Sequence, residues 1–383
     1  MSGERLLEIV DLHVHFETQE GTVRALRGVD LVIRRGETVG LVGESGCGKS
    51  MTARAILNMV PRPGRIVKGV VRLFRGGDHR AGAQVVEITK LDPFGPEMRA
   101  IRGKEIAMVF QEPMASFSPV HTVGNQIVEA IVIHQGLSKP QARERAAELL
   151  DLVGIPNPRQ RLDSYPFELS GGMRQRAMIA MALSCDPDLL IADEPTTALD
   201  VTIQAQILEL LQRLQEQLGM AILLITHNLG VVAAMAHRMA VMYLGKVVEE
   251  GESVDIFDSP AHPYTRALLR SMPRAGERSG TGRGKRRRLW AIAGSVPGSH
   301  THVSGCSFHP RCPEAIPGLC DQQDPEPLAV GRSQWVRCLL YEESRAVPGA
   351  AASTQVPGAS PAEAAVPGTD TSERGPKRGG QPA

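Results

Sequence analysis

Short apolar runs alternate with helical patterns along the first 260 residues of the chain. Four runs are almost wholly apolar and have the length of buried strands: residues 38–42, 106–110, 189–193 and 221–226. Residues 6–16 alternate between apolar and polar, which predicts an edge strand. Helices are expected at residues 51–57, 122–134, 139–153 and 170–183. Short buried strands alternating with helices are typical of a parallel sheet in an α/β protein.

A glycine-rich loop joins the first apolar run to the first helix. Residues 43–50 fit the phosphate-binding pattern G-x-x-x-x-G-K-S/T in the strand–loop–helix context that it needs. The loop N–H groups and the helix N-terminus attract phosphate, Lys49 would reach the β- and γ-phosphates, and Ser50 would ligate Mg²⁺. The expected ATP-binding residues are Gly43, Glu44, Ser45, Gly46, Cys47, Gly48, Lys49, Ser50 and Met51.

Candidate catalytic side chains follow the other apolar runs. Asp193 and Glu194 end one run and so lie at the carboxyl edge of the parallel sheet, where ligands of such sheets bind. Asp193 is the candidate Mg²⁺-side carboxylate, and Glu194 is the candidate base that polarises the attacking water. His227 and Gln111 follow two further runs. A lone histidine is usually structural, but the position of His227 after a phosphate loop and the Asp193–Glu194 pair favours a catalytic role.

Residues 170–173 open a helix whose free N–H groups form a second anion site, far along the chain from the first. The ordered set of motifs over about residues 5–260 resembles the nucleotide-binding subunit of an ABC transporter. In that resemblance the motifs are Walker A at 43–50, the Q-loop at Gln111, the signature at Ser170, Gly171, Gly172 and Met173, Walker B at Asp193 and Glu194, the D-loop at Asp200, and the switch histidine at His227.

The resemblance implies a fold and an activity. The fold is a P-loop NTPase of the ABC type over residues 1–260, with a helical subdomain at about 112–185 that meets membrane subunits. The activity is hydrolysis of ATP with Mg²⁺, in which Gln111, like Ser50 and Asp193, is a Mg²⁺-side residue. The signature and Asp200 then contact ATP held by a partner subunit. Phe16 is expected to stack on adenine, although an aromatic that merely ends a strand is the alternative.

Four of the six cysteines lie within 33 residues of the C-terminal extension, which we define as residues 261–345. They are Cys306, Cys312, Cys320 and Cys338. With the sequence His-Pro-Tyr-Thr at 262–265, which is expected to open a helix, they resemble the extension of oligopeptide/dipeptide importer ATPases, a subfamily that also moves nickel complexes. The resemblance therefore narrows the class of solute to peptides, with nickel or another small solute as the alternative.

The four cysteines are candidate ligands of a metal group. Disulfides are disfavoured in the cytosol, and thiolates in fours suit zinc or an iron–sulfur cluster. Five, seven and seventeen residues separate them, so the paired spacing of zinc sites is absent. The resemblance implies a 4Fe–4S cluster, while zinc and free thiols remain alternatives. Because the cysteines follow the ATPase motifs in the chain, we expect them to be structural and independent of nucleotide binding.

Charge and composition limit the other classes of function. Lys and Arg number 43 against 42 Asp and Glu, which leaves no basic field for nucleic acid. With one Walker A motif and no heptad run, a non-transport ABC ATPase acting on nucleic acid or ribosomes is disfavoured. Residues 346–383 are rich in Ala, Pro, Gly and Ser and are expected to be disordered.

Location and partners follow from the absence of membrane signals and from the resemblance. The chain has no run of eighteen apolar residues and no N-terminal signal pattern, so we expect a peripheral protein at the cytoplasmic face of the cell membrane. The resemblance implies a homologous ATPase subunit, two integral-membrane permease subunits and, through them, an extracytoplasmic solute-binding protein. Such a complex would use ATP to import di- or oligopeptides.

Overall fold

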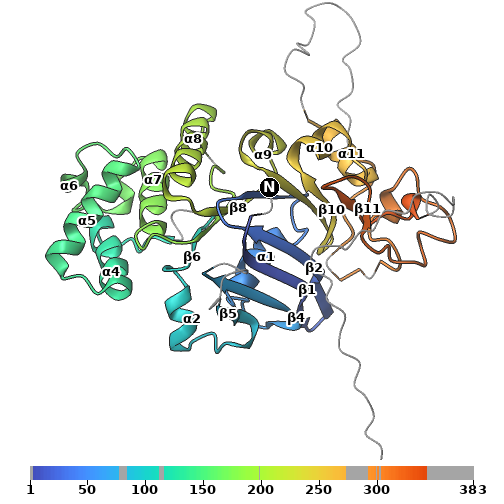
Figure 1. Cartoon of the computed structure of the whole chain (residues 1–383), viewed down its shortest axis with the longest axis horizontal. Coiled ribbons are helices and arrows are strands. Elements are labelled where there is room, and N and C mark those ends of the chain that lie inside the picture. The colour runs from blue at the N-terminus through green and yellow to red at the C-terminus, as the bar shows by residue number, and fades with distance from the viewer. Residues whose placement is uncertain are drawn as a thin grey trace, which may run out of the picture.

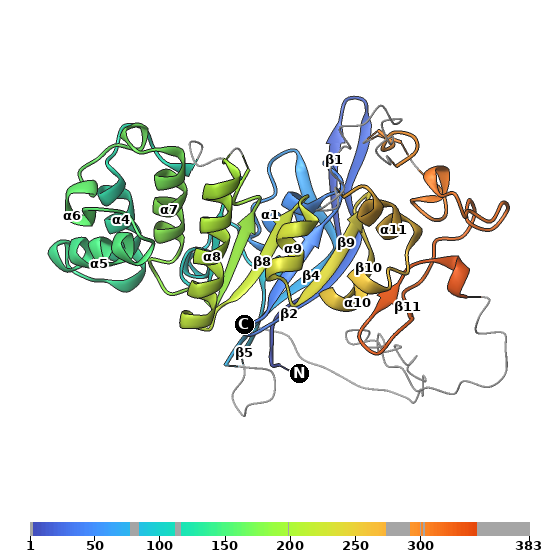
Figure 2. The ribbon, with the colours of Figure 1, turned by 90° about the horizontal axis from the view of Figure 1, so that it is seen from above.

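We describe the fold from a computed structural model, for residues 3–76, 84–111, 116–197, 199–272, 292–298, 300–301 and 303–342. The expected disordered tail at 346–383 lies outside these residues. A helical lobe occupies one end of the long axis, the C-terminal extension occupies the other, and two sheets lie between them (Figures 1 and 2). Among the described helices, none has the length and hydropathy needed to cross a membrane.

The first sheet is antiparallel and has the strand order β2-β1-β4-β5. Its strands are β1 (Arg5–Thr18), β2 (Gly21–Arg34), β4 (Gly64–Arg75) and β5 (Gln84–Glu87). The predicted strand at 6–16 is confirmed, but it is an interior strand, because β1 pairs with both β2 and β4. Alternation reports which face of a strand is buried, and it carries no information about hydrogen-bonding neighbours.

The second sheet has the order β11-β12-β10-β9-β3-β8-β7-β6. The four apolar runs form its parallel strands, and β9 also lies parallel to β3. These strands are β3 (Thr38–Val42), β6 (Ile106–Val109), β7 (Leu189–Asp193), β8 (Ala221–Thr226) and β9 (Arg238–Tyr243). The helix predicted after the phosphate loop is α1 (Lys49–Ile56). The other helices outside the helical lobe include α2 (Pro96–Ile101) and α9 (Leu229–Met235).

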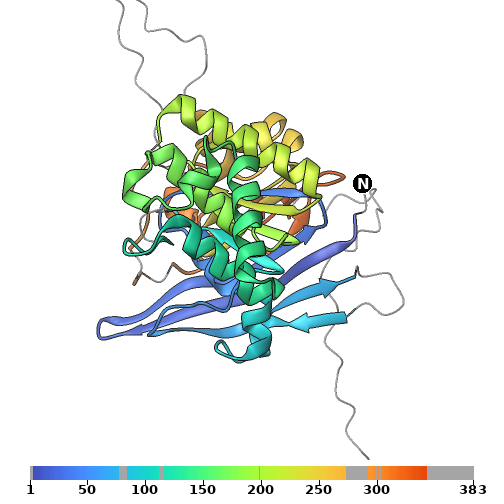
Figure 3. The same ribbon diagram turned by 90° about the vertical axis from the view of Figure 1, so that its left-hand side faces the viewer.

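The helical lobe consists of α4 (Val123–Gln135), α5 (Lys139–Leu152), α6 (Pro158–Arg161) and α7 (Gly171–Ala182). Figure 3 views the molecule from this lobe, with the long antiparallel strands running beneath it. The three helices predicted from sequence in this region agree with α4, α5 and α7. Their ends follow local signals: the Thr122 hydroxyl accepts a hydrogen bond from the N–H of Asn125, and Gly154 follows α5 with φ 74°.

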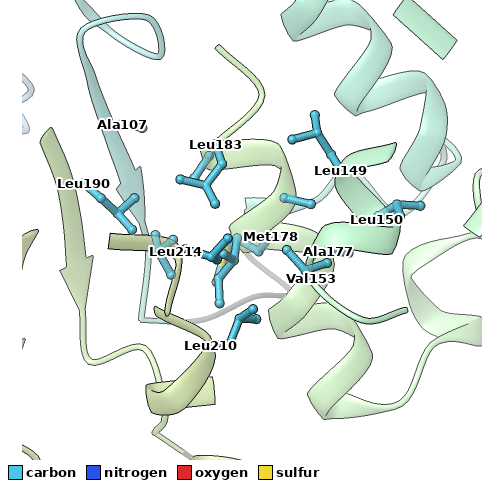
Figure 4. Close-up of a cluster of buried hydrophobic side chains, with 14 of the residues drawn as sticks. Ala107, Leu149, Leu150, Val153, Ala177, Met178, Leu183, Leu190, Leu210 and Leu214 are labelled. Carbon is cyan, nitrogen blue, oxygen red and sulfur yellow. The ribbon is translucent and has the colours of Figure 1, made fainter. Parts of the chain in front are cut away.

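A buried cluster joins the helical lobe to the strands of the ATP site. Leu190 of β7 packs with Met178 and Leu183 at α7 and with Leu210 and Leu214 of α8 (Val201–Leu218), as Figure 4 shows. All five side chains are at most 2% exposed. Burial of this many large side chains fixes α7 and α8 relative to β7.

The C-terminal extension continues the second sheet. The short strand β12 (Trp335–Val336) pairs antiparallel with β10 (Lys246–Glu252), and β11 (Leu328–Ala329) pairs antiparallel with β12. The helix predicted at His262 is confirmed as α11 (Pro263–Arg270), which follows α10 (Ser253–Asp258). Burial lowers the pKa of His262 to about 3, so its neutral ring accepts the helix-capping hydrogen bond from the N–H of Tyr264.

Candidate active site

The phosphate loop has a backbone that depends on its glycines. Gly43 has φ 153°, and a Cβ there would lie 2.2 Å from the carbonyl oxygen of Met242. Gly48 has φ 109° and is the N-cap of α1. The ammonium of Lys49 is buried under the loop and donates to the carbonyls of Gly43 at 2.8 Å and Glu44 at 3.0 Å. The loop and the first turn of α1 therefore form the expected cradle for phosphate.

The structure brings the expected catalytic residues together around Glu194. Gln111 donates from Nε2 to Oε2 of Glu194 at 3.0 Å, and Nδ1 of His227 lies 3.1 Å from the Oε1 atom. Ser50 donates from its hydroxyl to Oδ1 of Asp193 at 3.0 Å. The two candidate Mg²⁺ ligands therefore face one another beside the phosphate loop, and the candidate base has a separate set of partners.

The chain turns sharply at Glu194. Its φ of 47° lies in the left-handed region, which is uncommon for a residue with a side chain. Its N–H donates to the carbonyl of Ile225 at 2.8 Å, so the turn is held to the end of β8. Strained backbone at the end of a strand is common where a side chain must be aimed at a site. The turn separates the partners of Asp193 from those of Glu194.

The two adjacent carboxylates have opposite pKa shifts. Burial raises the pKa of Asp193, although the hydrogen bond from Ser50 opposes it. Burial also acts to raise the pKa of Glu194, but the hydrogen bonds with His227 and Thr197 outweigh it and leave that pKa below its usual value. Glu194 is therefore a carboxylate at neutral pH, the form needed to polarise water. Thr197, which donates to Glu194 at 2.9 Å, was not predicted.

A cavity of about 630 Å³, which we call the ATP cavity, opens beside the phosphate loop. This volume is typical of small-molecule sites. Its walls come from the phosphate loop and α1 with Gln111 and Glu194, from strand β2, from Leu244 and Gly245, and from the C-terminal extension at residues 296–298, 300 and 301. The structure therefore assigns one wall of the ATP cavity to a segment that the motifs did not indicate.

The stacking of Phe16 on adenine stays a prediction. Among the described residues that line the ATP cavity, Phe16 is absent, whereas its neighbour across the sheet, Val23, is present. The Phe16 ring lies against Gly64, where a Cβ would come within 2.6 Å of it. The missing side chain of Gly64 leaves room for the ring on the surface of the antiparallel sheet.

The signature and the D-loop lie together, apart from the described lining of the ATP cavity. The Ser170 hydroxyl caps α7 by accepting from the N–H of Met173 at 3.3 Å, and Asp200 caps α8 in the same way. A Cβ on Gly172 would lie 2.9 Å from the side chain of Ile203. Only glycine lets the two helix starts approach this closely. The two helix starts therefore form one surface, where the sequence predicts a second anion site.

The four cysteines of the C-terminal extension line one small pocket, the cysteine pocket, together with Phe308 and His309. None of them is in a disulfide. The N–H of Ile316 donates to the sulfur of Cys320 at 3.3 Å. Burial raises the pKa of Cys306, Cys312 and Cys338, although nearby backbone N–H groups oppose the rise. Within the described residues, however, no group of three or more His, Cys, Asp or Glu side chains is placed to hold a metal ion.

A phosphate loop together with two carboxylates, Asp193 and Glu194, at the carboxyl edge of a parallel sheet is typical of a P-loop ATPase. The chain belongs to the ABC transporter family: residues 26–197 match the family described as ABC transporter, and residues 248–320 match the oligopeptide/dipeptide transporter C-terminal region. The resemblance to this family is therefore confirmed, and so are its ABC-type fold and its activity as an ATPase.

The relatives of this chain include two proteins named as dipeptide transport ATP-binding protein DppD. That of Escherichia coli (strain K12) is 47% identical over 329 residues, covering 85% of this chain and 94% of that protein. That of Bacillus subtilis (strain 168) is 46% identical over 340 residues, covering 89% and 96%. A dimeric, post-hydrolysis structure of the ATP-binding cassette MJ0796 with ADP and Pi has a TM-score of 0.56 at 28% identity, covering 65% of this chain and 99% of that one.

Proposed function

We propose that this chain hydrolyses ATP to energise the import of di- or oligopeptides as one subunit of an ABC transporter. The observation that carries the proposal is the joining of the ATPase core to a C-terminal region of the oligopeptide/dipeptide type. The two relatives named for dipeptide transport support it along most of the chain. Nickel or another small solute remains the alternative, because other subunits would select the solute.

We infer that the complete hydrolysis site needs a second ATPase subunit. The surface formed by Ser170, Gly172 and Asp200 lies apart from the described lining of the ATP cavity, which suits contact with ATP held by another copy or homologue. The related cassette MJ0796 was solved as a dimer. The full assembly would contain a homologous ATPase, two permease subunits and a solute-binding protein reached through them, with this chain on the cytoplasmic face of the membrane.

Assembly should control the rate of hydrolysis. We expect the isolated subunit to hydrolyse ATP slowly, because its signature has no partner nucleotide to contact. Adding the partner ATPase and permeases in lipid should raise the rate, and dipeptide-loaded binding protein should raise it further, as measured by phosphate release. Full activity from a strictly monomeric preparation would refute this arrangement. Stimulation by nickel-loaded but not dipeptide-loaded binding protein would favour the alternative solute.

For the cysteine pocket we propose a 4Fe–4S cluster held by Cys306, Cys312, Cys320 and Cys338. The donor set supports this proposal, because four thiols outside any disulfide share one pocket and the N–H of Ile316 donates to the sulfur of Cys320. Hydrogen bonds to sulfur are a known means of stabilising and tuning such clusters. The spacing of the cysteines, which lacks the paired ligands of zinc sites, favours a cluster over zinc. A cluster would tie together a part of the chain with few regular elements.

Iron content tests this proposal. Protein purified without oxygen should be brown and contain about four irons per chain. Cys312→Ser should remove the colour and most of the iron, because it deletes one ligand. Cys185→Ser should not, because Cys185 lies in the ATPase core beside Ser184. Stoichiometric zinc without iron would show that the pocket holds zinc and not a cluster. Protein free of both metals would show that the four cysteines are free thiols.

A further inference from the structure

Glu44 of the phosphate loop is held by two residues of the C-terminal extension. Its carboxylate accepts hydrogen bonds from both terminal nitrogens of Arg311, at 2.7 and 3.1 Å. Its backbone N–H donates to the hydroxyl of Tyr264 at 2.9 Å. The sequence predicted only a phosphate-loop role for Glu44, and 267 residues separate it from Arg311. The sequence did not predict a contact between the extension and the nucleotide site.

The arginine side of this contact is buried, whereas the Glu44 side chain is 25% exposed. The Arg311 side chain is only 5% exposed, and its Nε donates to the carbonyl of Ala293 at 3.0 Å. Tyr264 packs on Tyr243 and Phe308, with ring centroids 4.7 and 5.3 Å apart. A two-pronged guanidinium–carboxylate pair fixes direction as well as distance, and a buried one is costly to break from one side.

The same residue also holds the lysine that binds phosphate. The carbonyl of Glu44 accepts from the Lys49 ammonium at 3.0 Å, and the carbonyl of Gly43 next to it accepts at 2.8 Å. The path from Arg311 to Lys49 therefore passes through one residue, Glu44. Independently, residues 296–298, 300 and 301 of the extension form a wall of the ATP cavity. Two separate parts of the extension thus reach the nucleotide site.

We propose that Arg311 is a positioning residue of the ATP site, and that it acts with Tyr264 by holding Glu44 so that the phosphate loop is ready to bind ATP. The C-terminal extension is on this view part of the nucleotide-binding apparatus of its own subunit. The proposal needs only that the chain binds ATP. It depends neither on the transported solute nor on what the cysteine pocket holds.

The expected effect is on ATP affinity more than on the chemical step. Without its partner, Glu44 no longer has a fixed direction, and the loop must be ordered by ATP itself. If only a fraction of the molecules has a phosphate loop able to bind ATP, the apparent affinity for ATP falls in proportion to that fraction. We expect Arg311→Gln to raise the KM for ATP about tenfold with little change in kcat, since couplings of this kind alter affinity by roughly 3- to 30-fold.

The test is a double-mutant cycle measured in the assembled complex. Glu44→Gln and Arg311→Gln are made singly and together, and KM, kcat and the Kd for a fluorescent ATP analogue are compared. If Arg311 acts through Glu44, adding Arg311→Gln to Glu44→Gln should raise the KM for ATP by less than about twofold. Arg266→Gln is the matched control, because it breaks an ion pair to Glu314 within the same extension, and its KM should stay that of the wild type.

Two milder variants keep the test valid if Arg311→Gln lowers the stability of the protein so far that it does not fold. Arg311→Lys keeps the positive charge but loses the paired hydrogen bonds of the guanidinium group. Tyr264→Phe keeps the ring but loses the hydroxyl that accepts from the N–H of Glu44. Each should raise KM by a few-fold while the protein stays folded, with a melting temperature lowered by only a few degrees. The proposal is overturned if both variants retain the wild-type KM. It is also overturned if Arg311→Gln has the same effect with and without Glu44→Gln, or lowers kcat while KM is unchanged.

Discussion

Glu194→Gln should keep ATP binding and lower turnover of the assembled transporter by a factor on the order of 10²–10³. Glutamine has the same shape and can keep hydrogen bonds to Gln111 and Thr197, which now donate to the carboxylate at 3.0 and 2.9 Å. It cannot accept a proton from water at neutral pH. Binding is expected to survive because Lys49 and the phosphate loop are unchanged. The variant should therefore accumulate in a closed, ATP-bound dimer.

Two measurements check this expectation together. Equilibrium binding of ATP should match the wild type within a few-fold, and steady-state phosphate release should be nearly lost. Glu97→Gln is a suitable control, because this half-exposed carboxylate on α2 lies near Arg75 and does not line the ATP cavity among the described residues. Wild-type turnover of Glu194→Gln would remove Glu194 from the role of base, even if binding behaves as expected.

The order of strands explains why one carboxylate collects the catalytic partners. In the order β3-β8-β7-β6, strand β7 lies between β8 and β6. Glu194 follows β7, His227 follows β8 and Gln111 follows β6, so the glutamate stands between the other two. The sequence predicted that all three end at the same edge. It did not predict which strands are neighbours, because pairing between strands depends on contacts distant in the chain.

The parts of the site that could be predicted share one property. The phosphate loop, the Walker B carboxylates and the signature each act through residues adjacent in the chain, so a short pattern specifies both the turn and the chemistry. Thr197 lay within reach of the same reasoning, since it follows Glu194 by three residues and donates to it. Arg311 and Tyr264 did not, because their role depends on a contact between segments far apart in the chain.

Phe16 shows a different limit of prediction from sequence. Its place near the end of β1 was predicted, but the direction of its ring depends on what the neighbouring strands leave open. Gly64 on β4 removes a side chain opposite Phe16 and so provides space for the ring. Val23 on β2, paired with Phe16, lies in the wall of the ATP cavity instead. An alternating pattern cannot distinguish these outcomes, because it does not record the size of the partners across the sheet.

Lys49→Ala should abolish nucleotide binding itself, with affinity for ATP lowered about 100-fold or more. The ammonium is the buried positive charge of the phosphate loop, only 5% exposed, and lies between the carbonyls of Gly43 and Glu44. Alanine removes the charge that would meet the β- and γ-phosphates and leaves both carbonyls without this donor. Since binding precedes chemistry, ATP hydrolysis should be lost to the same extent. Isothermal titration with ATP measures the loss directly.

Comparison with Glu194→Gln separates the two roles, because that variant should bind ATP without turnover and Lys49→Ala should do neither. Lys90→Ala serves as the control: this exposed lysine pairs with Glu87 at 3.0 Å, away from the ATP cavity, and its removal should leave affinity unchanged. A melting temperature close to that of the wild type would show that the loop, and not the fold, is altered. Retained ATP affinity in a folded Lys49→Ala protein would mean that the phosphate is held by the backbone N–H groups alone.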